Sequence, residues 1–488
     1  MPPQSVVVAA PDSSGVRLRQ RLERAVVAVL LLDGAAPFWA GAYLPLVDLP
    51  QHLALARILG APHDAAAGFD HFFRLQVGPS PYWGYLAPVW LLAKLMPLEL
   101  ASRIFLSLWA VVLPLSIGRL LRALGRDWRW AAFSLPLIWN SHLFWGFTAL
   151  LASMPLYFYT VAIAIERFDL GPPDRRTDLR LGGLALAVFL CHVQGFLLLV
   201  ASLLLLSLLQ GGGVRRHARR LIFLVPALAL FGLFFASQVA GDEPMSPLHA
   251  MHRPRYSQVT GPDAWDFESP GVTLSRLPER IWGAYTDGSD DAIGAAWILL
   301  LIVGLIFARG AGEAGRERSP ASFRGELLCL LALGCYLCLP YELAGQPYFN
   351  TRYPVFAALL APVFLTQPAT GRRRALCAAA AALGFVAHLN AAWKFAAFQR
   401  ETEGFDAVLA RIPAGRRVLG LVFDRGERDL FRLGPHLHFP AYYVARQGGD
   451  AGFTFAGLPA QPVRYRPEGQ ALHPDEWKPW EFDWEEMA

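Results

Sequence analysis

The chain has 488 residues, of which 54% are hydrophobic and 17% charged, and its mean hydropathy of +0.34 is well above that of a soluble domain. The net charge of +5 comes from arginines that cluster between apolar segments, which is a topology signal and not a nucleic-acid footprint. These properties exclude a soluble globular protein and give no reason to expect nucleic acid as a partner.

The basic clusters predict how the chain crosses the membrane. Residues 1–24 form a basic arm that we place in the cytoplasm. With each later cluster also inside, the apolar segments give about eleven transmembrane helices, an external C-terminus and a location in the plasma (inner) membrane. The predicted spans are 25–46, 101–119, 130–145, 147–166, 181–209 as two short helices that turn near His192, 221–240, 291–308, 326–343, 354–368 and 375–393.

Residues 82–97 are the exception, because crossing there would put the next arginine cluster on the wrong side. The segment is short, contains Pro88 and carries four Tyr and Trp residues, so we expect it to lie in the interface. Asp33, inside the first span, is costly at membrane depth and should face the protein interior.

The tail differs in composition from the segments before it. We predict a transmembrane domain over 25–395 and a small external (periplasmic) α/β domain over 396–488. Within the tail, the patterns predict a helix at 402–411, a buried strand at 418–423, a helix around 436–446 and a short strand at 453–455. The expected fold is therefore an all-α polytopic membrane protein with interfacial helices and an α/β tail.

The segment after the first span contains the candidate catalytic acid. Asp48 precedes a helix expected over 49–59, with Pro50 in its first turn, an oily side, and Gln51 and His52 among its polar residues. Such a helix should lie along the interface and hold the carboxylate at the membrane surface. Asp48 is then a general base or a metal ligand, or it only caps the helix.

His52 lies one helical turn beyond Asp48 and could hold it, share a metal with it or bind a phosphate. Asp48 and His52 are only half a metal site, and the sequence places no further acid beside them. The need for a divalent metal therefore stays open, and no other cofactor is indicated.

Basic side chains in later external loops are candidate ligands for an anionic lipid head. Arg352 and Tyr353 open the helix at 354–368, and an arginine there can grip a phosphate with its planar fork. The alternative is an ordinary snorkelling arginine. Arg253 and Arg255 form a second basic group in the loop 241–290. His142 and His192, at two outward turns, should approach the same cavity or be hydrogen-bonded core histidines.

This layout resembles the GT-C membrane glycosyltransferases, such as protein O-mannosyltransferases and lipid A aminoarabinose transferases. The likeness rests on Asp48 after the first span, on the interfacial segments 49–59 and 82–97, and on Arg352-Tyr353-Pro354 at the start of a late helix. It implies that Asp48 positions or deprotonates an acceptor, and that Arg352 contacts the phosphate of a polyprenyl-phosphate-linked sugar. Leu49 stands where many members have a second acid.

The leading functional hypothesis is therefore transfer of a sugar from a polyprenyl-phosphate donor to an acceptor at the external membrane face, with that donor and membrane lipid as partners. One alternative is a transporter or flippase of a lipid-linked or anionic substrate, although the paired halves common in that class are not visible here. The other is a non-catalytic membrane assembly subunit.

Overall fold

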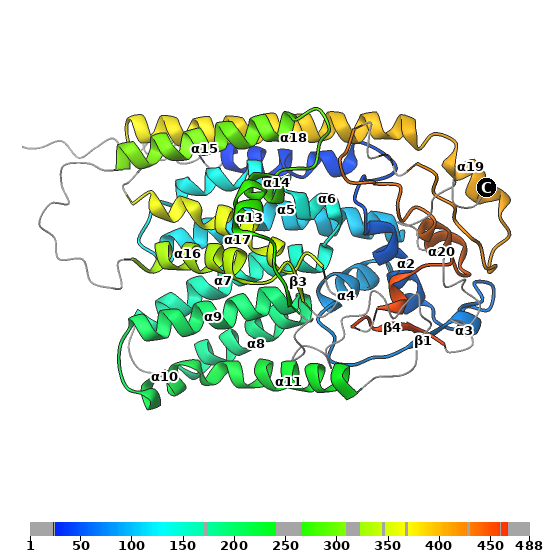
Figure 1. Ribbon diagram of the computed structural model, residues 1–488, viewed down its shortest axis with the longest axis horizontal. Coiled ribbons are helices and arrows are strands. Elements are labelled where there is room, and N and C mark those ends of the chain that lie inside the picture. Colours follow the sequence, from blue (N-terminus) through cyan, green and yellow to red (C-terminus); the bar gives the residue numbers. More distant parts are fainter. Residues whose placement is uncertain are drawn as a thin grey trace, which may run out of the picture.

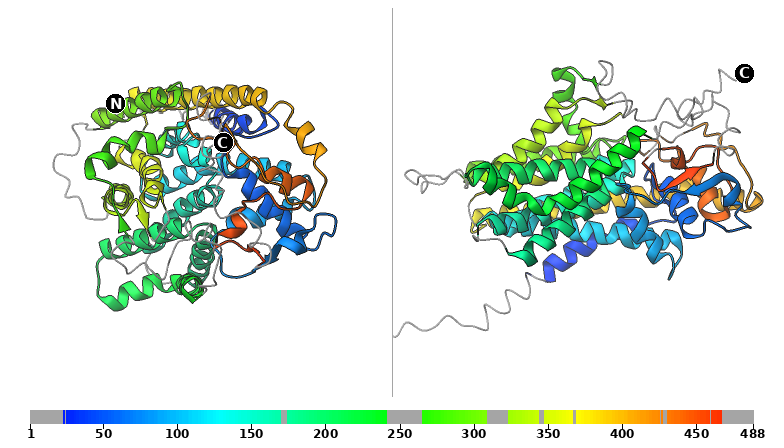
Figure 2. Two further views of the ribbon diagram at one scale, coloured as in Figure 1. Left: turned by 45° about the vertical axis from the view of Figure 1, so that its right-hand side comes forward. Right: turned by 90° about the horizontal axis from the view of Figure 1, so that it is seen from below.

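The computed structural model describes residues 23, 25–169, 174–240, 265–308, 323–343, 347–366, 369–424, 426, 430–458 and 460–466. This part of the chain is an elongated bundle of helices with a smaller group of short elements at one end (Figures 1 and 2). A helical, membrane-inserted protein is therefore supported.

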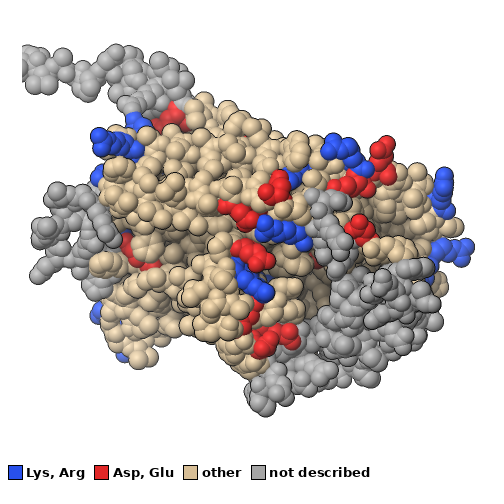
Figure 3. Space-filling model, turned by 45° about the horizontal axis from the view of Figure 1, so that its top comes forward, with Lys and Arg blue, Asp and Glu red and all other residues tan. Residues whose placement is uncertain are grey.

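Among the described residues, five helices are long and apolar enough to cross a membrane. These are α5 (Leu98–Ala123), α7 (Thr148–Asp169), the stretch Val214–Gln238 with α10 (Val214–Leu221), η4 (Ile222–Leu224) and α11 (Val225–Ala240), then α15 (Ser289–Ala308) and α18 (Arg372–Glu401). Large apolar side chains on them are exposed, for example Ile306 at 63% and Trp393 at 58%, as expected for surfaces that face lipid. On the face in Figure 3, uncharged residues cover much of the helix bundle.

The other predicted spans are shorter, so the count of eleven is not confirmed. They correspond to helical residues 25–33 with η1 (Ala36–Trp39), and to α8 (Arg175–Cys191), α9 (Val193–Leu209), α16 (Arg324–Cys338), and α17 (Tyr353–Leu360) with η9 (Ala361–Phe364). The break that separates α8 from α9 falls at His192, where the prediction put it. Helix α4 (Trp83–Leu92) has 10 residues and is too short to cross.

The predicted helix at 130–145 is wrong. The segment contains η2 (Trp128–Ser134), η3 (Pro136–Ile138) and the short α6 (Ser141–Trp145). Pro136 lacks the N–H that a continuous α-helix would need, and the Ser134 hydroxyl donates to the carbonyl of Ala131 at 2.6 Å. The irregular backbone is buried among helices. At membrane depth, irregular backbone is tolerated where it is buried in protein in this way.

Among the described residues, arginines of the predicted clusters lie at one end of the bundle, as the topology argument required. Arg119 pairs with Glu166, Arg126 with Glu326 at 2.9 Å, and Arg324 with Asp169 at 2.7 Å. These pairs join the ends of α5, α7 and α16. We call this the basic end of the bundle.

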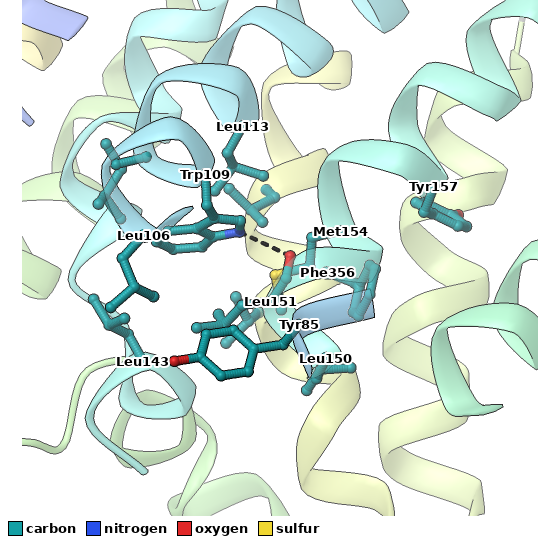
Figure 4. Close-up of a cluster of buried hydrophobic side chains, with 14 of the residues drawn as sticks. Tyr85, Leu106, Trp109, Leu113, Leu143, Leu150, Leu151, Met154, Tyr157 and Phe356 are labelled. Atoms are coloured by element: carbon teal, nitrogen blue, oxygen red, sulfur yellow. Dashed lines mark hydrogen bonds between the residues drawn. The ribbon is translucent and has the colours of Figure 1, made fainter. Parts of the chain in front are cut away.

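A tightly packed core positions the other end. Helices α5 and α7 run parallel, and the Trp109 indole N–H donates to the carbonyl of Leu151 at 2.8 Å within the cluster in Figure 4. Tyr85 of α4 lies in the same cluster, and its hydroxyl is 2.7 Å from that of Ser102. Helix α4 is thereby fixed against α5, beside α2 (Leu49–Gly60).

The predicted strands of the tail are also wrong. Described residues 418–423 form no strand, and Leu419, Leu421 and Phe423 are exposed. The apolar run suggested a buried strand, but it has no sheet to join. Residues Phe455–Gly457 form η10, and the helices are α19 (Phe405–Arg411) and α20 (Ala441–Gln447).

The tail strand is β4 (Val463–Tyr465), which pairs antiparallel with β1 (Phe73–Leu75) from the loop after the first helix. Helix α3 (Phe69–Phe72) precedes β1, and α20 packs on α2. A second short pair joins β2 (Trp265–Asp266) to β3 (Glu342–Leu343), near α13 (Pro270–Ser275) and α14 (Leu277–Ile281). The first loop and the tail therefore share one sheet and one interface.

Candidate functional site

Asp48 immediately precedes α2 and is fixed through its backbone. The amide of Val47 donates to the carbonyl of Phe144 at 2.9 Å, and that of Asp48 to the carbonyl of Trp145 at 3.0 Å. Gly146 follows with φ +77°, and a Cβ there would lie 2.8 Å from the Asp48 nitrogen. Only glycine fits both the backbone conformation and this close approach, so the turn between α6 and α7 fixes the position of Asp48.

The carboxylate of Asp48 does not cap the helix. It accepts no hydrogen bond from the first turn of α2, all of which the structure describes. Capping is therefore not the reason for an acid at this position. The side chain is 14% exposed.

The expected contrast between an oily side and a polar side of α2 is not seen, and its position along the membrane interface stays a prediction. Ten of its twelve residues are buried, Gln51 and His52 included, because α4 packs on one side and the tail on another. The Gln51 amide donates to the carbonyl of Phe453 at 3.2 Å and accepts from the amide of Phe455 at 3.0 Å. Gln51 thus holds the tail in place.

The histidine beside Asp48 is one that sequence reasoning missed. His438 Nε2 lies 3.5 Å from Asp48 Oδ1, and its ring stacks on Phe453 at 5.7 Å. His52, the predicted partner, instead packs against the rings of Tyr85 and Phe455. No local pattern links His438 to Asp48, since only the docking of the tail brings them together.

Burial sets the protonation of this group. It raises the pKa of the Asp48 carboxyl to about 8, while the positive charge of Arg352 acts in the opposite direction. Burial lowers the pKa of His52 to about 4 and that of His438 to about 3, so both imidazoles are neutral at pH 7. A carboxyl that changes charge near neutral pH is suited to proton transfer.

Arg352 lies at the centre of a polar cluster. It precedes α17, donates from Nη1 to the carbonyl of Tyr348 at 3.1 Å and lies over the Phe147 ring at 5.2 Å. Its charge acts on Asp48, on the Tyr82 hydroxyl and on the imidazoles of His142 and His192. We call Asp48, Tyr82, His142, His192 and Arg352 the Arg352 cluster.

Three separate segments hold the Arg352 cluster together. The rings of Tyr82 and His192 lie 6.3 Å apart, which places the start of α4 beside the α8–α9 break. Gln194 Nε2 donates to the carbonyl of Phe349 at 2.6 Å and so ties that break to the loop before Arg352. Tyr348 in this loop has φ +60°, a strained conformation that is common at binding sites.

The remaining predicted site residues are placed as follows. Tyr353 is buried inside the bundle next to Gln194. Arg253 and Arg255 lie outside the described residues. Within the described ranges, no group of three or more His, Cys, Asp or Glu side chains is arranged to hold a metal ion, so Asp48 and His52 gain no third metal-ligating partner there.

The cluster joins residues from the first loop, the middle of the chain and the turn before α17, at the end of the bundle opposite the basic end (Figure 1). Comparison with models of protein families, with curated proteins and with solved structures gives no match to this chain.

Proposed function

We propose that the protein is an integral membrane glycosyltransferase that moves a sugar from a polyprenyl-phosphate donor to an acceptor at the external face of the plasma (inner) membrane. The finding that supports this best is that Arg352 lies close enough to Asp48 for its positive charge to lower the pKa of the carboxyl. A carboxyl with a pKa of about 8 and a guanidinium interact across the same cluster, although their positions in the sequence are far apart.

In this reaction the Asp48 carboxylate accepts the proton of an acceptor hydroxyl as its oxygen attacks the anomeric carbon. The bond between that carbon and the phosphate oxygen breaks, and the leaving phosphate keeps the electron pair. Arg352 stabilises the negative charge on that phosphate through its planar fork. The Tyr82 hydroxyl and the His192 imidazole lie beside the same phosphate.

The proposed orientation places the basic end in the cytoplasm and the Arg352 cluster outside, with the N-terminus inside, the C-terminus external and about eleven crossings when short helices and the segment 128–145 are counted. Single cysteines at positions 70 and 125 test this in intact cells. A membrane-impermeant reagent should label position 70 and leave position 125 unlabelled. The reverse result would invert the proposed topology.

Transfer is tested with purified protein in lipid nanodiscs and a radiolabelled polyprenyl-phosphate sugar. Asp48→Asn should abolish transfer and retain donor binding, because it removes only the proton acceptor. Arg352→Ala should raise the KM for the donor, and Arg352→Lys should restore part of the affinity through charge without the fork. Transfer at the wild-type rate by Asp48→Asn would refute the assignment of the base.

The same protein in sealed vesicles separates the alternatives. A transporter or flippase would move the labelled lipid or its head group across the bilayer without forming a product, and an assembly subunit would do neither.

A further inference from the structure

A pocket of about 260 Å³ lies beside the Arg352 cluster and has no role in the steps proposed above. Its walls come from α6, from α14 and the residue before it, and from the loop before α17. Phe147 separates it from Arg352, because the guanidinium lies over one side of this ring at 5.2 Å and the His142 imidazole stacks on it at 5.8 Å. The pocket and the cluster therefore share His142.

One wall of the pocket is a row of aromatic rings. Trp145 stacks on Phe147 at 5.9 Å, Tyr348 follows Trp145 at 5.3 Å, and Tyr341 follows Tyr348 at 5.5 Å. The faces of such rings carry negative electrostatic potential and attract the C–H bonds of a ligand. A flat or gently puckered ring with C–H groups on one face is complementary to this wall.

The other side of the pocket supplies polar groups. His142 lines the pocket but is only 2% exposed, and its ring is turned towards the backbone of Thr351 and Arg352. Its ring nitrogens are buried and are therefore not open to a ligand in the pocket. The exposed carboxylate of Glu279 lies at the rim.

The charges of the pocket balance. Arg276 and Arg280 both pair with Glu268, at 3.1 and 2.7 Å, and Arg280 also lies over the Tyr341 ring at 5.1 Å. Two arginines and two glutamates leave no net charge, so neither a phosphate nor an ammonium group is favoured. Basic and acidic side chains also alternate in the central part of the face in Figure 3. The volume is below the about 300–1,000 Å³ of pockets for drug-sized ligands.

We propose that this pocket binds one uncharged carbohydrate ring of the acceptor, with its C–H face on Trp145 and Tyr348 and its hydroxyls on Glu279. The acceptor role rests on the proposed function, whereas the binding of a sugar ring does not. The acceptor hydroxyl would then approach the Arg352 cluster past His142.

The test measures binding of methyl glycosides of common hexoses and pentoses to the full-length protein in detergent, by saturation-transfer difference NMR and calorimetry. Tetramethylammonium and inorganic phosphate serve as the charged probes. At least one glycoside should bind, and Tyr348→Leu and Glu279→Gln should each weaken its binding by about tenfold. Trp265→Leu, an exposed tryptophan that does not line the pocket, should leave it unchanged.

An unchanged melting temperature shows that each variant is folded. The inference is overturned if no glycoside binds, or if both pocket variants bind the glycoside as well as the wild type does. It is also overturned if only a charged probe binds and the pocket variants abolish that binding. Asp48→Asn should retain glycoside binding. If the pocket binds glycosides but the protein shows no sugar-transfer activity, only the proposed function is refuted. If the protein transfers sugar but the pocket binds no glycoside, only the pocket assignment is refuted.

Discussion

The pH dependence of stability in Asp48→Asn tests the electrostatics of the site. Burial places the pKa of the Asp48 carboxyl at about 8 in the folded protein, against about 3.9 in an unfolded chain. Between these values the folded state binds one proton more than the unfolded state, so the free energy of unfolding falls as the pH rises. Below about pH 4 the carboxyl is protonated in both states, so the free energy of unfolding does not change with pH. Above about pH 8 it is ionised in both states, and the free energy of unfolding falls no further.

The magnitude follows from the pKa difference. One pKa unit is worth about 1.4 kcal/mol, so about four units give a loss of about 5–6 kcal/mol at pH 8 and above. Because the side chain is 14% exposed, access of water makes this an upper limit. Asparagine cannot ionise, so Asp48→Asn should be more stable than the wild type. This difference in the free energy of unfolding should be larger at pH 8.5 than at pH 5.5, by about 3 kcal/mol.

Thermal unfolding in one detergent, followed by circular dichroism at both pH values, measures this difference. Asp64→Asn is the matched control, because hydrogen bonding to Arg57 lowers the pKa of the Asp64 carboxyl. Asp64 is therefore ionised throughout this range, and its variant should show no pH-dependent gain. If Asp48→Asn is less stable at both pH values, or if its advantage does not grow with pH, the carboxylate is charged in the folded protein and the reasoning fails.

Three further outcomes are expected. The transfer rate should rise with pH towards about pH 8, and Arg352→Ala should move that rise to higher pH, because the charge of Arg352 lowers the pKa of Asp48. An unchanged pH profile in Arg352→Ala would show that Arg352 does not act on Asp48. Gly146→Ala should reduce both transfer and the melting temperature. The control Gly125→Ala, at φ +71° with open space around it, carries only the backbone strain and should lower the melting temperature less. Equal effects would mean that the clash with Asp48 costs no stability. Gln51→Ala should cost about 1–2 kcal/mol by leaving two partly buried backbone groups unpaired, and hydrogen exchange at residues 453–455 should report it. Unchanged protection there would contradict the role of Gln51.

The sequence predicted those features that follow from membrane thermodynamics. Described arginines of the predicted clusters lie at one end, the apolar stretch at 181–209 breaks at His192, and Asp33 turns inward to His388 at 2.8 Å. Each expectation depended on a cost that the membrane imposes on any fold, that of a charge in lipid or of unpaired backbone. The helix α2 begins at Leu49 as expected, because Pro50 fits a first turn in any surroundings.

The errors share one cause. Residues 418–423, the side chains on α2 and the irregular segment at 130–145 depend on what packs against them, and sequence periodicity does not identify a packing partner. Helix α2 looked amphipathic because Gln51 and His52 are polar, yet both are buried by residues of the tail. The strand that does pair with the first loop, β4, has only three residues.

His438 shows what this means for the site. The raised pKa of Asp48 requires that water be kept from the carboxyl, and His438 of the tail contacts it directly. Gln51 and the β1–β4 pair fasten the tail there. In the proposed reaction the first loop supplies the acid, the turn before α17 supplies the cation, and the docked tail helps to keep water from the acid. The sequence of the transmembrane domain alone identifies the candidates Asp48 and Arg352 but not His438, which contacts the acid from the tail.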